Sequence, residues 1–376
     1  MFYISSFIFF SYVALVFYAL YGWQKTSRSK ASHCMPQVRP DEYPTISIIV
    51  VLRNEIQAIP MLIASFDALD YPEHLIEILL VDDHSTDDSF AKLCELTQGN
   101  SMYNILQCPQ NIEGKKTALA WSVAQTNNDY ILFTDADCQV PSTWISAYVE
   151  QIVQHKSAYF LFGLVNHSVE KTFLQQWFSL DFLSLVAMQG GLAKVGKAFS
   201  CNAANMCISR QFALTQYETN SAYSSGDDVF LLHKAKLIDK EAVVFVQSIK
   251  AMVITKAPET VKQFIKQRIR WASKTGGYKD RWSLLVAAIV YATSLCIVGL
   301  CIVSMFNHSF FSVFCTLFIA KTLIDSVFFA CILPHFHKQK LLPQVVLFQA
   351  FYVLYIVLIP IFVLIIPQSW KGRKIT

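Results

Sequence analysis

Four long apolar segments, one at the start of the chain and three near its end, most constrain how this sequence can fold. Phe2 to Trp23 carries no charge, and the later runs are Leu284–Phe306, Phe310–Leu333 and Leu341–Ile366. At about 1.5 Å of rise per residue, a helix of about twenty residues crosses a hydrocarbon core of about 30 Å. With 54% hydrophobic and 15% charged residues, the chain is too apolar for a soluble domain and too charged for membrane helices alone. We therefore predict a soluble middle region between membrane helices.

The first apolar segment is predicted to be a retained membrane anchor. It lacks the basic start and the small-residue cleavage site of a signal peptide. Lys25, Arg28, Lys30 and Arg39 follow it, and a basic flank of this kind is typical of the cytoplasmic side. We expect an integral membrane protein, of a bacterial inner or cell membrane, whose middle region is cytoplasmic.

The same reasoning leaves the topology of the chain's end open. Three successive C-terminal spans place Lys371, Arg373 and Lys374 outside, against the tendency of basic residues to stay inside. Either this tail is too short to matter, or the segment interrupted by Pro343 and Pro360 is re-entrant.

Lys321 and Asp325 form a charged pair inside the third predicted span. They lie four residues apart, one helical turn, so each can neutralise the other. A lone lysine at the middle of a membrane costs roughly 2.5 to 3.5 kcal/mol, which favours pairing. We favour a tie between helices, and the alternative is a polar lining for an acceptor path.

The cysteines and the net charge bear on the compartment and the partners. The ten cysteines contain no CxxC pair or regular framework, which suits a reduced cytoplasmic face. The formal charge of +4 comes with no basic stripe interleaved with aromatic residues, so nucleic acid is not expected as a partner. Basic residues near the spans suit anionic membrane lipids instead.

The middle region repeats a strand, a turn and a helix. Strands are predicted at Thr45–Leu52, Ile76–Val81, Asn104–Gln107 and Tyr130–Phe133. Their starts lie roughly 25 to 30 residues apart, the length of a βα unit. This spacing predicts an α/β fold with a parallel sheet, right-handed crossovers and a ligand site at the carboxyl ends of the strands.

Two carboxylates follow the last of these strands. Asp135 and Asp137 come directly after Tyr130–Phe133, at alternate positions. Carboxylates this close repel each other unless a positive charge lies between them, and a divalent ion carrying a diphosphate fits that position. The alternative is a helix cap or a solvated turn, where aspartate is common.

Other polar residues follow the earlier strands. Glu55 comes after the first strand. Asp83 comes after the second strand, where an acid can accept hydrogen bonds from a base or ribose. The sequence Ser85-Thr86-Asp87-Asp88 is predicted to cap the following helix, with the two acids in its first turn. Lys115, in a Gly-Lys-Lys sequence, precedes the next helix and can supply a cation for phosphate, although the rest of a P-loop is missing.

Three later segments carry further signals. Phe173 to Lys197 is too interrupted to span, and it is predicted to be either an interfacial amphipathic helix or a plain surface helix. Asp227 and Asp228 begin a helix, and capping explains one of these acids but not easily both. Gln267 to Trp271 reads QRIRW, which places an amide, a guanidinium and an indole on one helical face. The alternative for this last motif is a juxtamembrane anchor.

These motifs resemble a known family. VVLRNE, VDDHSTDDS, EGKKTAL and TDADC, in this order and spacing, resemble the nucleotide-sugar domain of glycosyltransferase family 2. QRIRW resembles the QxxRW pattern of its membrane-embedded members, which include ceramide glucosyltransferases and synthases of chitin, hyaluronan and cellulose type. The chain departs from the family at His84 and Asn202, where glycine is usual, and at Leu52, where proline or alanine is usual.

The resemblance implies a GT-A type α/β domain joined to transmembrane α-helices, with Mg or Mn as the cofactor. The implied site residues are Glu55, Asp83, Lys115 and Asp135 for the donor, Asp137 with Asp135 for the metal, Asp228 as general base beside Asp227, and Gln267, Arg270 and Trp271 for the diphosphate and acceptor. Asn202 to Met206 takes the place of a loop that lines the acceptor site in the family.

The implied function is that of a membrane-bound inverting glycosyltransferase. It takes a hexosyl or N-acetylhexosaminyl group from a nucleotide sugar, a UDP-sugar in the first instance, to a lipid-linked or polysaccharide acceptor. One alternative is a metal-dependent nucleotidyl or phosphoryl transferase, and the other is a membrane transporter or receptor with a nucleotide-binding domain. The predicted divisions are an anchor at 1–23, a linker at 24–43, the GT-A domain at 44–255, the interfacial QxxRW segment at 256–282 and a bundle of about three spans at 283–376.

Overall fold

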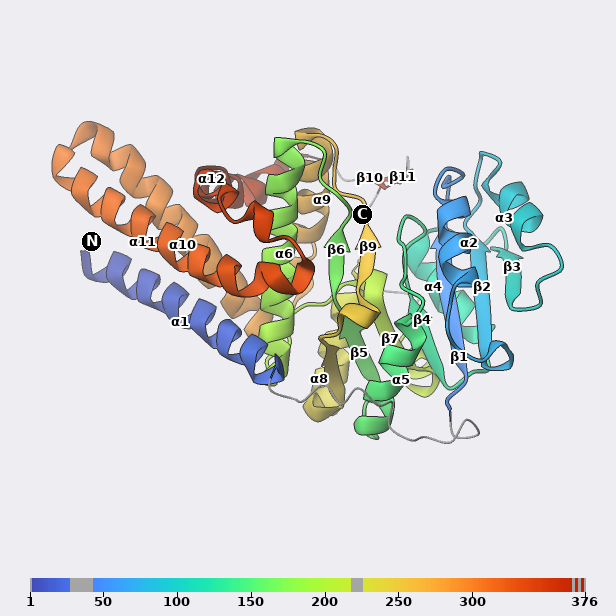
Figure 1. The fold of residues 1–376 in the computed structure, drawn as a ribbon. Helices are drawn as coiled ribbons and strands as arrows, with labels where there is room; N and C mark the ends of the chain where they lie inside the picture. The colour runs from blue at the N-terminus through green and yellow to red at the C-terminus, as the bar shows by residue number, and fades with distance from the viewer. Residues whose placement is uncertain (1, 28–42, 218–225, 367–368, 371–372, 375–376) are drawn as a thin grey trace. The chain divides into compact units, whose positions relative to one another are not determined.

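The computed structural model describes residues 2–27, 43–217, 226–366, 369–370 and 373–374 (Figure 1). Its backbone contacts divide the chain into a sheet unit, 29–168, 200–256 and 369–376, and a helical unit, 1–28, 169–199 and 257–368. Residues 169–199 therefore group with the long helices, and the divisions expected from the sequence stay predictions. Arg28, Lys30, Arg39 and Lys371, used above to predict sidedness, lie outside the described residues.

The sheet unit is built on a seven-stranded mixed sheet. The strand order is β3-β2-β1-β4-β7-β5-β8, and the first four strands along the chain are parallel to their neighbours, as predicted. The strands are β1 (Ile46–Leu52), β2 (Ile76–Asp82), β3 (Tyr103–Gln107), β4 (Tyr130–Phe133), β5 (Phe160–Gly163), β7 (Met206–Ser209) and β8 (Val243–Val246). A wholly parallel sheet is wrong, because β7 lies antiparallel between β4 and β5. The βα spacing behind that prediction ends at β4.

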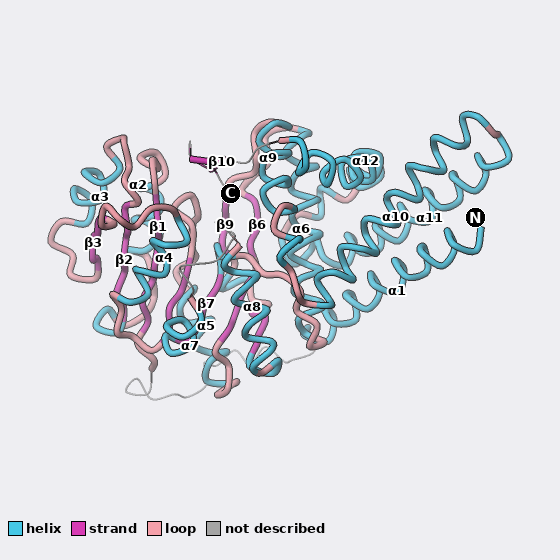
Figure 2. The backbone as a smooth tube through the Cα atoms, turned by 180° about the vertical axis from the view of Figure 1, so that it is seen from behind, coloured by secondary structure: helices cyan, strands magenta, loops and turns pink. Residues whose placement is uncertain are grey.

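The helices and two small strand pairs complete this unit (Figure 2). The helices are α2 (Ile59–Asp67), α3 (Ser89–Thr97), α4 (Lys115–Ala124), α5 (Trp144–Gln154), α7 (Arg210–Gln216) and α8 (Asp227–Ile238). The parallel pair is β6 (Val165–His167) with β9 (Val253–Thr255), and the antiparallel pair is β10 (Ser369–Trp370) with β11 (Arg373–Lys374).

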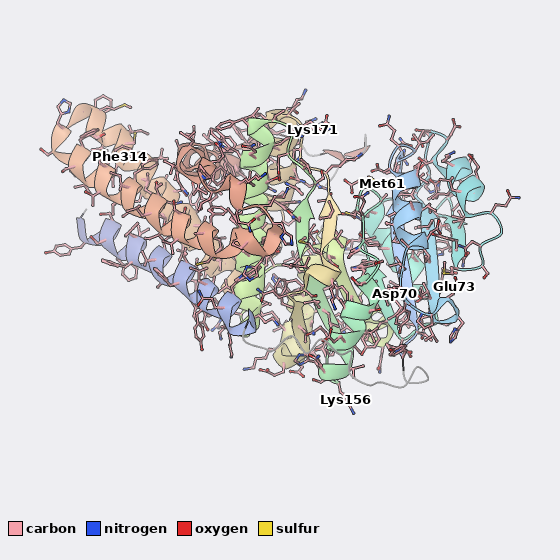
Figure 3. All side chains as sticks on the ribbon, viewed as in Figure 1. Met61, Asp70, Glu73, Lys156, Lys171 and Phe314 are labelled. Carbon is pink, nitrogen blue, oxygen red and sulfur yellow. The ribbon has the colours of Figure 1, made fainter. Side chains whose placement is uncertain are left out.

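The apolar sequence of the central strands explains their place in the core. Every residue of β1 is buried, as expected for an interior parallel strand rich in isoleucine and valine. Leu52 pairs with Asp82 of β2, and Ile49 pairs with Phe133 of β4, so the three strands end at one edge. Asp70 and Glu73, labelled in Figure 3, lie in the connection that leads into β2, toward the opposite edge. The polar residues after β1, β2 and β4 therefore share the carboxyl edge.

The helical unit contains the apolar segments. Its helices are α1 (Phe2–Ser27), α6 (Phe173–Lys194), α9 (Val261–Ala272), α10 (Arg281–Phe306), α11 (Phe311–Ile332) and α12 (Gln344–Ile365). Among the described residues, four helical segments are long and apolar enough to cross a membrane: Tyr3–Lys25, Arg281–Phe306, His308–Phe336 and Gln344–Ile365. α1 runs alongside α10 and α11 in both views (Figures 1 and 2). Phe314 of α11, labelled in Figure 3, stacks on Phe318, and their ring centroids are 5.8 Å apart. The predicted segments are confirmed as helices.

The two prolines do not interrupt the last of these helices. Pro343 occupies the N-cap position of α12, and Pro360 lies inside the helix, which continues for 22 residues. A proline at a helix start leaves no helical hydrogen bond unmade. A continuous helix of this length argues against the re-entrant alternative, and the sidedness of the tail stays a prediction.

α6 is largely buried, so the plain surface helix predicted for Phe173–Lys197 is wrong, and a place at a membrane interface stays a prediction. Leu180, Leu183 and Leu192 are fully buried, although Phe173 at its start is exposed. Residues on several faces of α6 are buried. Its sequence therefore shows neither a single apolar stripe nor an uncharged span. A Cβ at Gly22 of α1 would lie 1.9 Å from the carbonyl oxygen of Gly191, so α1 and α6 cross in backbone contact.

The buried charges of the third span tie helices together. Lys321 Nζ lies 2.6 Å from Asp325 Oδ2 and donates to Gln349 Oε1 of α12 at 2.9 Å. Asp325 also accepts hydrogen bonds from the Tyr12 hydroxyl of α1, at 2.5 Å, and from Gln349 Nε2, at 2.8 Å. This arrangement confirms the predicted inter-helix tie, which links α1, α11 and α12.

Candidate functional site

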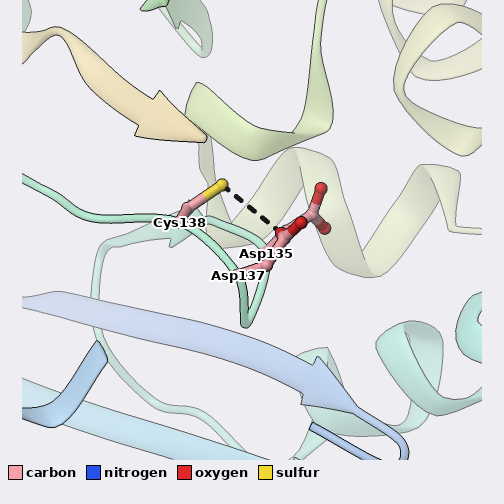
Figure 4. Close-up of side chains that lie close together, drawn as sticks. All are labelled: Asp135, Asp137 and Cys138. Carbon is pink, nitrogen blue, oxygen red and sulfur yellow. Dashed lines mark hydrogen bonds between the residues drawn. The ribbon is translucent and has the colours of Figure 1, made fainter. Parts of the chain in front are cut away.

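An acidic cluster lies where β4 ends. Asp135, Asp137 and Cys138 each offer a ligand atom, and these atoms lie within 4.8 Å of one another (Figure 4). The Cys138 thiol donates a long hydrogen bond, 3.8 Å, to Asp137 Oδ1. The close-up confirms that the two carboxylates share one place at the sheet edge.

The electrostatics of Asp137 favour a cation. Burial first, and then the negative charges of Asp135 and Glu55, raise the pKa of Asp137 above its ordinary value of 3.8, against a lowering by Lys115. Burial also raises the pKa of the Cys138 thiol well above 9.0, with the two aspartates adding to the effect. Without a metal the thiol therefore stays protonated, and the carboxylate oxygens are the charged donors of the cluster. Such oxygens fit Mg²⁺ or Mn²⁺.

Two consecutive lysines at the start of α4 contact two acids from different segments. Gly114 precedes the helix with a φ of 92°, a conformation that glycine adopts without strain. Lys115 Nζ pairs with Asp135 Oδ1, and Lys116 Nζ lies 3.8 Å from Asp227 Oδ1. α4 thus connects the acids after β4 with the acids at the start of α8. In the sequence, the only signal for this contact of Lys116 is its position next to Lys115.

Asp227 and Asp228 open α8, as predicted. Gly226 precedes them with a φ of 96°. Asp228 Oδ2 accepts a hydrogen bond from the Ala203 backbone N–H at 3.1 Å, and Oδ1 accepts one from its neighbour Val229 at 2.9 Å. Burial raises the pKa of Tyr217 well above 10.0, and the charges of Asp227 and Asp228 add to this effect. The backbone therefore fixes the Asp228 carboxylate, and Lys116 faces Asp227.

The acid after β2 is held by backbone, and the acid after β1 lies near the cluster at Asp137. Asp83 is fully buried, and its Oδ1 accepts a hydrogen bond from Gly114 N–H at 3.3 Å. The side chain of Arg53 donates to the Asp83 carbonyl oxygen at 3.0 Å, and Glu55 lies near enough to Asp137 to raise its pKa. His84 has a φ of 55°. The turn after β2 thus requires the left-handed conformation that glycine favours.

The expected cap of α3 is partly wrong. Asp88 stands at the N-cap position, but its side chain makes no capping hydrogen bond. Asp87 accepts one from Ser89 N–H at 3.1 Å, while Ser85 N–H donates to Asp82 Oδ2, also at 3.1 Å. The helix starts at Ser89, later than the Ser-Thr-Asp-Asp pattern indicates, because Ser85 and Asp82 close the preceding turn.

The loop at Asn202–Met206 is fixed from inside the sheet unit. The Asn205 side chain donates to the carbonyl oxygens of Leu164, at 2.6 Å, and Ala251, at 2.7 Å. Its Oδ1 accepts from Trp144 Nε1, at 2.9 Å, and from the Tyr148 hydroxyl, at 2.8 Å. Asn205 is completely buried, so its role is to hold the loop rather than to contact an acceptor.

The QRIRW residues lie on α9 of the helical unit. Gln267 Oε1 accepts a hydrogen bond from Arg268 Nη1 at 3.3 Å. Trp271 lies near Phe182 of α6, with ring centroids 6.3 Å apart. The structure brings Glu55, Asp135 and Asp137 together with Lys115. A meeting of these acids with Gln267, Arg270 and Trp271 stays a prediction.

Comparison with known proteins accounts for this arrangement. Residues 47–216 match the family described as Glycosyl transferase family 2. The chain carries a family 2 glycosyltransferase domain. The sheet is a mixed α/β sheet of the GT-A kind, and the DxD-type cluster lies at its carboxyl edge.

Several relatives of the family 2 domain are glycosyltransferases. The poly-beta-1,6-N-acetyl-D-glucosamine synthase of Staphylococcus epidermidis is 22% identical over 244 residues, 64% of this chain and 57% of the relative. The beta-monoglucosyldiacylglycerol synthase of Synechocystis sp. is 34% identical over 100 residues, 26% of this chain and 21% of the relative. The chain thus spans less than two thirds of the length of either relative.

A solved structure extends the likeness to the whole fold. The mannosyltransferase PcManGT from Pyrobaculum calidifontis, in complex with GDP-Man and Mn²⁺, matches with a TM-score of 0.57 and 14% identity. The match covers 96% of this chain and 98% of that one. At this identity the likeness shows a shared fold.

Proposed function

We propose that this chain is a membrane-embedded inverting glycosyltransferase. It transfers a sugar from a nucleotide sugar to a lipid-linked or polysaccharide acceptor on the cytoplasmic side. The proposed donor is a UDP-sugar. The observation that carries the proposal is the acidic cluster of the family 2 domain, where Asp137 faces two further carboxylates across from Lys115. The relatives that make polymers of N-acetylglucosamine or glucosylate diacylglycerol support the two acceptor classes.

The donor side of the reaction is assigned to the edge formed by β1, β2 and β4. Asp83 and Glu55 bind the nucleoside, and Asp135 and Asp137 hold Mg²⁺ or Mn²⁺. When bound, the ion supplies positive charge to the leaving diphosphate. Lys115, which pairs with Asp135, is placed to contact a phosphate when the acid takes another partner.

The acceptor side is assigned to Asp228. Two backbone N–H groups hold its carboxylate in place, and a general base must lie within hydrogen-bonding reach of the attacking hydroxyl. Asp228 accepts the proton of the acceptor hydroxyl while that oxygen bonds to the sugar carbon and the bond to the diphosphate breaks. A single displacement of this kind inverts the configuration. Arg270 binds the diphosphate, and Gln267 and Trp271 bind the acceptor.

The test uses the purified full chain in phosphatidylcholine nanodiscs. UDP-glucose, UDP-N-acetylglucosamine and GDP-mannose are supplied in turn with Mg²⁺, Mn²⁺ or a chelator, and dioleoylglycerol or a β-linked N-acetylglucosamine oligomer is the acceptor. Metal-dependent release of nucleoside diphosphate together with a labelled lipid or glycan is the expected result. Release of pyrophosphate identifies a nucleotidyl transferase instead. Absence of both donor binding and release across the panel contradicts the proposal.

A further inference from the structure

Arg268 is the most enclosed charge of α9 and was given no role by the sequence. It lies between Gln267 and Ile269 in the QRIRW motif, with 7% of its side chain exposed. Its Nη1 donates to Gln267 Oε1 at 3.3 Å. A guanidinium this far from water needs both charge neutralisation and packing partners.

The charge of Arg268 is neutralised from another helix. Its Nη2 forms an ion pair with Asp181 of α6, which is also buried, and Asp181 accepts a hydrogen bond from the Tyr355 hydroxyl of α12. Phe264 of α9 stacks on Phe178 of α6, with ring centroids 4.4 Å apart and an angle of 11° between the rings. α9 is therefore tied to two further helices of its unit.

The flat surface of the guanidinium contacts two aromatic rings of α9 itself. Its central carbon lies 4.2 Å from the ring centroid of Trp271 and 4.6 Å from that of Phe264. These rings stand three residues after and four residues before Arg268, so all three side chains share one face of the helix. Guanidinium groups within about 6 Å of an aromatic face are attracted to it.

The chemistry of this position requires arginine rather than any cation. Arg268 Nε has no hydrogen-bond partner among the described residues, so the full hydrogen-bonding fork is not the reason for arginine here. Lysine could also neutralise Asp181, but it offers no planar surface to an indole. The property that only arginine supplies at this site is a planar cation over the rings of Trp271 and Phe264.

We infer that Arg268 is a positioning residue, held by Asp181 and Tyr355, that fixes the orientation of the Trp271 indole. The inference rests on the proposed function for its consequence, because Trp271 is there an acceptor-binding side chain. The acceptor then meets an indole whose orientation is set before binding, which lowers the cost of ordering the site. Loss of the flat contact weakens acceptor binding, whereas donor binding stays as it is.

The test compares Arg268→Lys with the wild-type full chain in nanodiscs. The first readout is acrylamide quenching of Trp271, obtained by subtracting the emission of Trp271→Phe within each background, because the chain has seven tryptophans. We expect quenching of Trp271 to rise at least twofold in Arg268→Lys. The second readout is the KM for dioleoylglycerol or the N-acetylglucosamine oligomer, expected to rise about tenfold, with binding of the UDP-sugar unchanged. Unchanged quenching and an unchanged KM overturn the inference.

A double variant separates positioning from folding. Arg268→Met combined with Asp181→Leu removes both charges of the ion pair and leaves no buried charge unpaired. This variant therefore tests the orientation of Trp271 without the loss of stability that a broken ion pair causes. If Arg268 serves only as half of an ion pair, the double variant keeps the wild-type KM and quenching, and the inference fails. If Arg268 positions Trp271, the double variant folds but shows a KM and a Trp271 quenching that are raised over the wild type, as in Arg268→Lys. Failure of the proposed function is distinct, because a wild-type chain without transfer still reports Trp271 quenching.

Discussion

The sheet unit and the helical unit both enclose carboxylates, but they neutralise them differently. In the helical unit, Asp325 meets a lysine, a tyrosine hydroxyl and an amide. Asp181 meets an arginine and a tyrosine hydroxyl in the same way. In the sheet unit, Asp137 faces two carboxylates and one lysine, and its pKa is raised. The difference separates acids that hold helices together from acids arranged to receive a cation or a proton.

The largest expected effect tests the sheet unit at Asp228. Asp228→Asn keeps the size of the side chain and one of its two backbone hydrogen bonds, but its amide cannot accept the acceptor proton, so transfer should fall by about 10² to 10⁴-fold. Binding of the UDP-sugar should persist, as measured by calorimetry on the full chain. Asp239→Asn, at the other end of α8, is the matched control and should remain active. A fully active Asp228→Asn enzyme would refute the assignment of the base.

The next effect tests the helical unit at Asp325. Asp325→Leu leaves Lys321 buried without its carboxylate and should cost about 3 to 5 kcal/mol of unfolding free energy, measured in detergent. Lys321→Met in the same chain should recover most of that loss. Ser326→Ala is the control, because among the described residues this hydroxyl bonds within its own helix, to the Thr322 carbonyl oxygen at 2.7 Å. A double variant as unstable as the single one would show that the pair is more than a tie.

A metal titration tests whether the carboxylates around Asp137 bind a divalent metal ion. Mn²⁺ at about 100 times its Kd should stabilise the protein by about 2.7 kcal/mol, seen as a rise in Tm. Asp137→Asn should abolish this rise, and Asp88→Asn, which removes an exposed carboxylate, should keep it. A rise in Asp137→Asn equal to that of the wild type would place the metal elsewhere.

Without metal, the raised pKa of Asp137 predicts the direction in which stability changes with pH. The folded pKa of Asp137 is above its ordinary 3.8, so in this window the folded state binds more protons than the unfolded state. Stability therefore falls as pH rises from 3.8 through the raised pKa. Asp137→Asn should remove this component of the pH profile of Tm, whereas Asp88→Asn should keep it. A rise in stability across that window, assigned to Asp137 by the difference, would contradict the raised pKa.

The smallest expected effect concerns the turn beside the site. His84→Gly removes the cost of a left-handed backbone conformation at a non-glycine residue, about 1 to 2 kcal/mol. It also removes the contact of His84 Nε2 with the Ile112 carbonyl oxygen at 3.0 Å. The net gain in unfolding free energy should be below about 1 kcal/mol. His74→Gly, at a position without a positive φ, should lose stability instead. A clear loss in His84→Gly would mean that the ring contact outweighs the backbone strain.

Local patterns in the sequence predicted much of this molecule. The apolar runs gave β1, β2 and β4 nearly to the residue, and the alternate aspartates after β4 indicated the cluster at Asp135 and Asp137. The spacing of Lys321 and Asp325 indicated their pairing. In each of these cases the physical cause lies within one segment.

The features that the sequence did not reveal depend on partners far along the chain. α6 is buried because residues on several of its faces find neighbours in other helices, which no periodicity within α6 records. Arg268 resembles any other basic residue near a membrane until Asp181 and Tyr355 are placed beside it. The antiparallel β7 is a four-residue strand whose direction depends on where the chain returns to the sheet.

The crossing of α1 and α6 at Gly22 and Gly191 has a consequence for biosynthesis. Gly22 leaves the ribosome long before Gly191, so in the membrane-embedded enzyme proposed above α1 enters the bilayer before its partner helix has been made. A generic hydrophobic leader put in place of α1 should still target the nascent chain to the translocon. It would nevertheless leave α6 without the glycine that its backbone contacts at Gly191.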